Sequence, residues 1–173
     1  MKGATTEPSA AIKSPPKISI TTPSNASQGV SLSQDIHITF SEEIATDTFG
    51  YTVSPSLGNA SVSWNDANTV ASISHDALTS ETTYTVRVTG AKDTAGNSLA
   101  SGSNPNPWSF TTADVTVPTV SSVSPSNGSS SIDVDENIVV TFSEAMNLSS
   151  LSYTSSPDPG DWNISWNSAN TVA

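Results

Sequence analysis

One stretch of about 56 residues occurs twice in this chain, and no other feature constrains the fold as strongly. Residues 16–71 align with residues 118–173 at one constant offset and without a gap, and roughly 24 of the 56 positions are identical. One well-preserved segment, Thr39–Glu42, recurs as Thr141–Glu144. The chain is therefore a tandem of one module, and its fold is the fold of that module.

The repeat sets the predicted domain boundaries. Its length of about 100 residues is the usual size of one domain. The chain divides into a polar, proline-containing linker expected to be disordered (1–16), a complete module (17–112), a short linker (113–117) and the first part of a second module (118–173). Because the second copy stops before the counterparts of the last strands, we expect it to be truncated, with an open core face and unpaired strand edges.

Short runs with alternating apolar and polar residues fill the chain from Lys17 onward, separated by clusters of Gly, Pro, Asn and Ser. Such runs predict an all-β antiparallel domain, and no window shows the period of a helix. About seven strands in the complete module favour a β-sandwich of the immunoglobulin type. The predicted strands cover 17–21, 35–40, 51–54, 60–64, 69–74, 83–89 and 108–112.

The segment from Leu78 to Val88 carries the most specific of these patterns. Tyr84, Val86 and Val88 alternate, and Leu78 precedes them. This spacing fits the corner at which immunoglobulin-type sandwiches enter strand F, where a buried tyrosine hydroxyl bonds to backbone a few residues upstream. We predict such a bond for Tyr84.

Several motifs resemble the bacterial Ig-like domain of the SbsA type, found in S-layer and other surface proteins. The second copy has Pro-x-Val-x-x-Val-x-Pro-x-Asn-Gly at 118–128 and Thr-Phe-Ser-Glu-Ala-Met at 141–146. The first copy matches the later part of the pattern at 84–86, 92–97 and 108–112. The resemblance implies tandem immunoglobulin-like sandwiches that act as spacer or adhesive units of a secreted, cell-wall or cell-surface bacterial protein, with neighbouring modules as partners. It does not imply an enzyme.

The charge and hydropathy of the chain exclude several kinds of partner. Sixteen acidic residues against 5 basic give a net charge of -11, which repels nucleic acid and anionic membrane surfaces. No segment approaches the roughly 18 apolar residues of a membrane span, and the first residues lack a signal-peptide core. We therefore expect no nucleic acid and no membrane insertion, and any export signal to lie outside this chain. The absence of cysteine excludes disulfides.

The densest group of acidic residues comprises Asp114, Asp133, Asp135 and Glu136. Carboxylate oxygens are the ligands that calcium prefers, and a calcium ion at the joint would stiffen the tandem. The corresponding loop of the first copy carries Ser and Gln in place of the three later acids, which favours a solvated acidic loop. Both hypotheses remain open, and calcium is the one cofactor that the sequence suggests.

Trp162 and Trp166 lie on one face of a predicted strand, about 13 Å apart. Exposed indoles stack on sugar rings, so this pair is a candidate site for cell-surface polysaccharide, as in a carbohydrate-binding accessory module of an extracellular enzyme. The matching face of the first copy, around Trp64, alternates small or apolar residues with Ser, which is more typical of a core face.

Candidates for catalysis are few. His37 aligns with Val139, so it is not part of the repeated design, and Ser is too abundant to indicate a triad. Glu42 and Glu144 recur at the end of one strand, where carboxylates commonly accept backbone N–H groups. The segment Asp93–Asn97 is interpreted as a turn. We expect no enzymatic activity from this chain.

Overall fold

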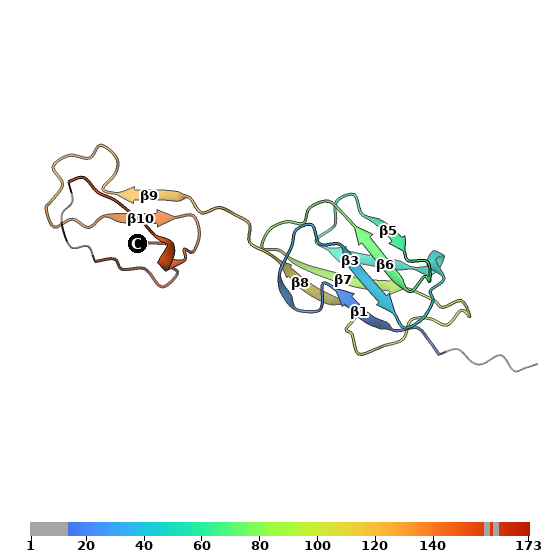
Figure 1. The fold of residues 1–173 in the computed structure, drawn as a ribbon. Helices are drawn as coiled ribbons and strands as arrows, with labels where there is room; N and C mark the ends of the chain where they lie inside the picture. The colour runs from blue at the N-terminus through green and yellow to red at the C-terminus, as the bar shows by residue number, and fades with distance from the viewer. Residues whose placement is uncertain (1–13, 158–159, 161–162) are drawn as a thin grey trace, which may run out of the picture. The chain divides into compact units, whose positions relative to one another are not determined.

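The computed structural model describes residues 14–157, 160 and 163–173, so most of the predicted linker at 1–16 lies outside the described residues. The chain divides into two compact units, Met1–Val115 and Thr116–Ala173, here named unit 1 and unit 2. Within the described part, no helix is both long and apolar enough to span a membrane. Figure 1 shows both units.

Unit 1 is a β-sandwich of two four-stranded sheets (Figure 1). One sheet has the order β1 (Ile18–Thr22), β3 (Ile36–Phe40), β6 (Val70–Ser74) and β5 (Ser61–Trp64). The other has the order β2 (Ser27–Val30), β8 (Trp108–Thr112), β7 (Thr83–Gly90) and β4 (Gly50–Ser54). A single 3₁₀ turn, η1 (Thr46–Thr48), precedes β4. This division of strands is that of an immunoglobulin-type sandwich, as the sequence predicted.

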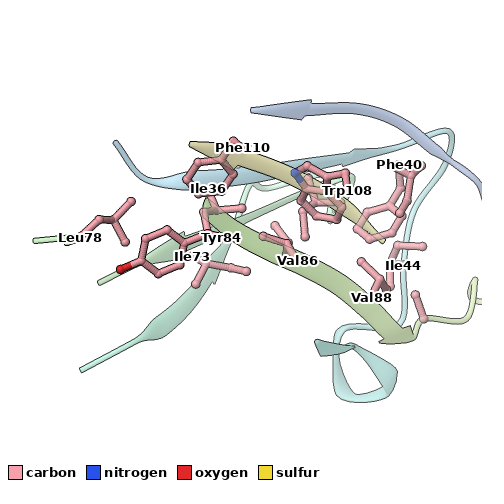
Figure 2. Close-up of a cluster of buried hydrophobic side chains, with 14 residues drawn as sticks. Ile36, Phe40, Ile44, Ile73, Leu78, Tyr84, Val86, Val88, Trp108 and Phe110 are labelled. Carbon is pink, nitrogen blue, oxygen red and sulfur yellow. The ribbon is translucent and has the colours of Figure 1, made fainter. Parts of the chain in front are cut away.

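The core lies between the two sheets because apolar residues alternate along their strands. On β3 every second residue, from Ile36 to Phe40, is buried, and on β7 the same holds for Tyr84, Val86 and Val88. Figure 2 shows these side chains converging with Trp108 and other buried residues. The polar residues between them face solvent, so each sheet has one apolar face toward the core and one polar face toward solvent.

Unit 1 contains one strand more than the seven that the sequence predicted. The additional strand, β2, has the sequence Ser-Gln-Gly-Val without alternation, and Gly29 adopts a positive φ of 66°. It pairs in parallel with β8, far along the chain, whereas the other named strand pairs are antiparallel. The local sequence of β2 does not predict a strand, because its pairing depends on a partner that lies far along the chain.

Unit 2 forms part of the same architecture. β9 (Val120–Ser124) and β10 (Val139–Phe142) pair antiparallel, as β1 and β3 do at the corresponding positions of unit 1. A 3₁₀ turn, η2 (Leu148–Ser150), lies where η1 lies in the first copy. Residues 129–132, 152–156 and 163–166, which correspond to β2, β4 and β5, are not strands, so the strand predicted to carry Trp166 does not form over the described residues.

Candidate functional site

The predicted tyrosine corner is confirmed. The Thr79 backbone N–H donates to the Tyr84 hydroxyl at 3.1 Å, and the Tyr84 ring stacks on Phe110 with 5.8 Å between centroids. Leu78 is buried, and Figure 2 shows it at the same end of the core as Tyr84. The corner lets a polar side chain lie inside the sandwich without an unsatisfied hydroxyl, so its role is structural.

The Asp93 segment is a closed turn whose carboxylate serves the backbone. Asp93 is only 1% exposed, and its Oδ1 accepts from the backbone N–H groups of Ala95 and Asn97 at 2.9 and 2.8 Å. Its Oδ2 accepts from the Asn97 side chain at 2.8 Å. Gly96 takes a φ of 89°, which favours glycine. These contacts confirm the interpretation of this segment as a turn.

A turn closed by an asparagine side chain, which sequence reasoning missed, occurs in both units. Asn65 Oδ1 accepts from the N–H groups of Thr69 and Val70 at 2.8 and 2.9 Å. In unit 2, Asn167 Oδ1 accepts from Thr171 and Val172 at 2.9 and 3.1 Å. The repeated sequence Asn-x-Ala-Asn-Thr could have indicated this turn, because Asn side chains readily bond to the backbone in turns.

Trp166 packs against its own unit. Its ring stacks on Phe142 with 5.8 Å between centroids and 23° between planes, and Trp64 stacks on Phe40 at 5.9 Å and the same angle. Trp162, the other member of the candidate carbohydrate site, lies outside the described residues. The matching stacks support a packing role for Trp166, and polysaccharide binding remains a prediction.

The four candidate calcium ligands fall in different units. Asp114 belongs to unit 1, whereas the exposed Asp133, Asp135 and Glu136 share one loop of unit 2. In that loop the Glu136 N–H donates to the Asp133 carbonyl at 3.1 Å. Among the described residues no three His, Cys, Asp or Glu side chains gather closely enough to hold a metal ion. A calcium site at the joint remains a prediction.

The remaining ionisable candidates bond to segments that are distant in sequence but lie in the same unit. A hydrogen bond of 2.9 Å joins His37 Nδ1 and Ser72 Oγ on the outer face of the β3–β6 pair. His75 Nε2 donates to the Gln34 carbonyl at 3.1 Å, and Glu144 Oε2 accepts from Thr116 Oγ1 at 2.7 Å. Each contact ties neighbouring segments together, which agrees with a structural interpretation of Glu144.

Unit 1 has two surface pockets with volumes of about 370 and 440 Å³, and both are lined in part by Leu99 and Asn106. Lys92 is the charged residue among the side chains that line them. Asn106 itself is used by the fold, since its side chain accepts from the Val88 N–H and donates to the Val88 carbonyl, both at 2.9 Å. Neither pocket combines an acid and a base among its lining residues.

The pairing of β2 with β8 is the feature of unit 1 with a direct mechanical consequence. The Ala26 N–H donates to the Ser109 carbonyl at 2.7 Å, and the Ala113 N–H donates to the Val30 carbonyl at 2.8 Å. Because the strands are parallel, the N-terminal end of β2 and the C-terminal end of β8 point to opposite ends of the sheet. Tension along the chain therefore shears this pair, which loads its hydrogen bonds together.

The chain resembles one known protein family and several solved structures. A family model described as "Bacterial Ig-like domain" matches residues 12–112 and again residues 114–172. No curated protein matches the sequence significantly. Solved structures with similarity include CopC from Methylosinus trichosporium OB3b, with 11% identity, a TM-score of 0.46, and coverage of 59% of this chain and 97% of that one.

The S-layer protein SbsC is also similar. A structure of its domains 1–6 has 21% identity and a TM-score of 0.38, with 72% of this chain covered. A structure of its N-terminal part has 20% identity, a TM-score of 0.38 and the same coverage of this chain. The present chain spans 17% and 30% of those two chains, respectively.

Proposed function

Because the chain belongs to the bacterial Ig-like domain family, we propose that it is a load-bearing, non-catalytic spacer in a secreted or cell-surface bacterial protein. The family match, which confirms the resemblance found in the sequence, covers both copies. In this role the module separates and presents other parts of the polypeptide, and neighbouring modules of the same kind are its partners.

The observation that carries the proposal is the parallel pairing of β2 and β8. β8 is the last strand of unit 1, and β2 directly follows β1, the strand with which the chain enters. Main-chain hydrogen bonds involving Ala26 and Ala113 mark the two ends of the β2–β8 pair. A module loaded in this way resists extension until the bonds of the pair break together.

The features that recur in both units support the same proposal. The Phe–Trp stack, the asparagine turn and a cap in which a Ser hydroxyl accepts a backbone N–H all occur twice. Each of them stabilises the sandwich. The acidic loop containing Asp133 and the histidine at position 37 behave differently, because neither is repeated.

Single-molecule force spectroscopy tests the proposal. The chain contains no cysteine, so Ser14→Cys and Val115→Cys give unique attachment points that load unit 1 along its own chain direction. In this background Ala113→Pro removes the N–H that bonds to Val30, and we expect a lower unfolding force. Ser103→Pro is the control, because the Ser103 N–H donates no backbone bond within the described residues.

A further inference from the structure

The two sheets of unit 1 have four edge strands, and three of them carry a feature that hinders pairing with a further strand. β1 is covered in part by the loop after β7, where the Asn104 side chain donates to the Ser19 carbonyl. β2 is irregular around Gly29, which has a φ of 66°. β4 has a register shift at Gly50 and is followed directly by Pro55. Covering loops, bulges and proline all protect sheet edges.

The fourth edge strand, β5, carries none of these features. Its sequence, Ser-Val-Ser-Trp, has no charged residue and no proline, and its register with β6 is regular. Within the described residues it pairs with β6 alone (Figure 1). The matching residues 163–166 of the second copy, Asn-Ile-Ser-Trp, also lack charge and proline. An unprotected edge is a template for another strand, so β5 is the edge of unit 1 that is open to pairing.

The hydrogen bonds of the β5–β6 hairpin determine which backbone groups face this edge. The Asn65 N–H donates to the Val70 carbonyl at 3.2 Å where the hairpin closes. Hydrogen-bonded and non-hydrogen-bonded pairs alternate along an antiparallel ladder, so Ser63 belongs to the next hydrogen-bonded pair. The N–H and C=O groups of Val62 and Trp64 therefore point away from β6, toward the open edge.

The side chain of Val62 lies at the same edge. It is on the inward side of the sheet, opposite the fully buried Ile73, yet it is 38% exposed, because no strand lies beyond it. Ser61 and Ser63, on the outward side, are small and uncharged. The edge thus offers backbone groups that lack a strand partner together with an apolar side chain that a further strand would cover.

We propose that β5 is a docking edge for one occupant, the β5 strand of a second copy of this chain. The two strands pair antiparallel about a two-fold axis at Val62. In this register Val62 of one copy lies opposite Val62 of the other, and Ser61 lies opposite Ser63. Ala60 of each copy lies opposite Trp64 of the other. The two four-stranded sheets become one continuous sheet.

A second copy fits this edge in backbone, side chains and charge. Directly opposite residues share a face, so valine meets valine on the core side and serine meets serine on the solvent side. The two Val62 residues exchange their N–H and C=O groups, and so do Ala60 and Trp64. Asp66, the charged residue nearest to β5 in sequence, falls opposite Gly58 of the other copy. No like charges therefore meet along the paired edges.

The short edge sets the expected strength. Pairing of four-residue strands buries less than the roughly 1,200 Å² of a stable specific interface, so we expect a Kd between about 10 μM and 1 mM. Each copy has a net charge of -11, and salt screens the general repulsion between two such copies. The association should therefore become stronger as the ionic strength rises.

Sedimentation equilibrium of the full 173-residue chain at concentrations up to about 1 mM tests the association. We expect a monomer–dimer equilibrium that salt strengthens. Val62→Lys places two ammonium groups at the two-fold axis, so the Kd should rise at least about tenfold. Ile164→Lys is the matched control, since it adds the same charge at the equivalent position of unit 2, where Ile164 is 41% exposed. This control should leave the Kd within about twofold.

Disulfide formation tests the register with uncharged substitutions, because the chain contains no other cysteine. The Cα atoms of a hydrogen-bonded antiparallel pair lie about 5.5 Å apart, which a disulfide spans, so Val62→Cys should cross-link two copies under a mild oxidant. Ser63→Cys is the control, because the two Ser63 residues are diagonal neighbours about 7–8 Å apart. We expect cross-linking of Val62→Cys to be at least about tenfold faster than that of Ser63→Cys.

Three outcomes would overturn the proposal. The first is a chain that stays monomeric up to about 1 mM at every ionic strength. The second is an equal effect of Val62→Lys and Ile164→Lys on the Kd, because the interface would then not be β5 of unit 1. The third is equal cross-linking rates for Val62→Cys and Ser63→Cys, because the strands would then not pair in the stated register.

Discussion

At the scale of the residue, three polar side chains buried in unit 1, those of Thr112, Asp93 and Tyr84, bond to the backbone of the segments between strands. Thr112 is 3% exposed, and its Oγ1 donates to the Thr79 carbonyl at 2.6 Å and accepts from the Thr82 N–H at 2.9 Å. Asp93 and Tyr84 serve the backbone in the same way. Buried polar groups need partners, and here those partners fix the loops.

Replacing Tyr84 with Phe is expected to lower the free energy of unfolding of unit 1 by about 1–2 kcal/mol, because the Thr79 N–H loses its acceptor while the ring stays buried. Urea denaturation followed by Trp fluorescence measures this change. Tyr51→Phe is the control, since the Tyr51 hydroxyl makes no hydrogen bond within the described residues, and its effect should stay under about 0.5 kcal/mol. Equal effects of the two substitutions would contradict the assigned role of the Tyr84 hydroxyl.

Residue-level prediction succeeded where the decisive contact is local in sequence. The Tyr84 bond spans 5 residues, and the Asp93 turn closes within 4, so spacing alone indicates both. The role of Trp166 could not be decided in this way, because its partner Phe142 lies on β10, far from Trp166 in the sequence. An alternating strand that carries a tryptophan looks the same whether the ring faces a core or a ligand.

At the scale of the element, the seven predicted strands of unit 1 agree with the observed ones to within about one residue at each end, because alternation and turn residues define them locally. β2 was not predicted because it is a short edge strand without alternating apolar and polar residues. Its existence depends on β8, which lies more than about 70 residues later, and only the folded sheet brings the two together.

The same substitution at equivalent positions of the two units should have different effects. Ile36→Ala leaves a cavity in a closed core and is expected to cost about 2–5 kcal/mol, measured as the loss of unfolding free energy of unit 1. Ile138→Ala removes a side chain that is 58% exposed, and its effect on unit 2 should stay below about 1 kcal/mol.

Amide hydrogen exchange on both variants separates the units. If Ile138→Ala destabilised the β9–β10 pair as much as Ile36→Ala destabilises β3, then the apolar face of unit 2 would be covered in solution, contrary to the exposure described above.

At the scale of the whole molecule, the two units share one design and differ in how far their sandwiches are closed. The acidic loop containing Asp133 belongs to unit 2 alone, and its three carboxylates are exposed. If this loop is solvated, then millimolar calcium should leave the melting temperature and the hydrodynamic radius unchanged. A calcium-stiffened joint would instead raise the melting temperature and reduce the hydrodynamic radius. The variant that combines Asp133→Asn with Asp135→Asn would then abolish both responses.

The central claim is that unit 1 resists tension along the chain through the β2–β8 pair, and the most direct test compares two pulling directions. Handles at Ser14→Cys and Val115→Cys shear β2 against β8. Handles at Ser56→Cys and Thr83→Cys lie just beyond the Ser54–Thr85 end of the β4–β7 pair, so they separate that pair one bond at a time. We predict a clearly higher unfolding force in the first direction at equal pulling speed. An equal or lower force would contradict the account of this module as a load-bearing spacer.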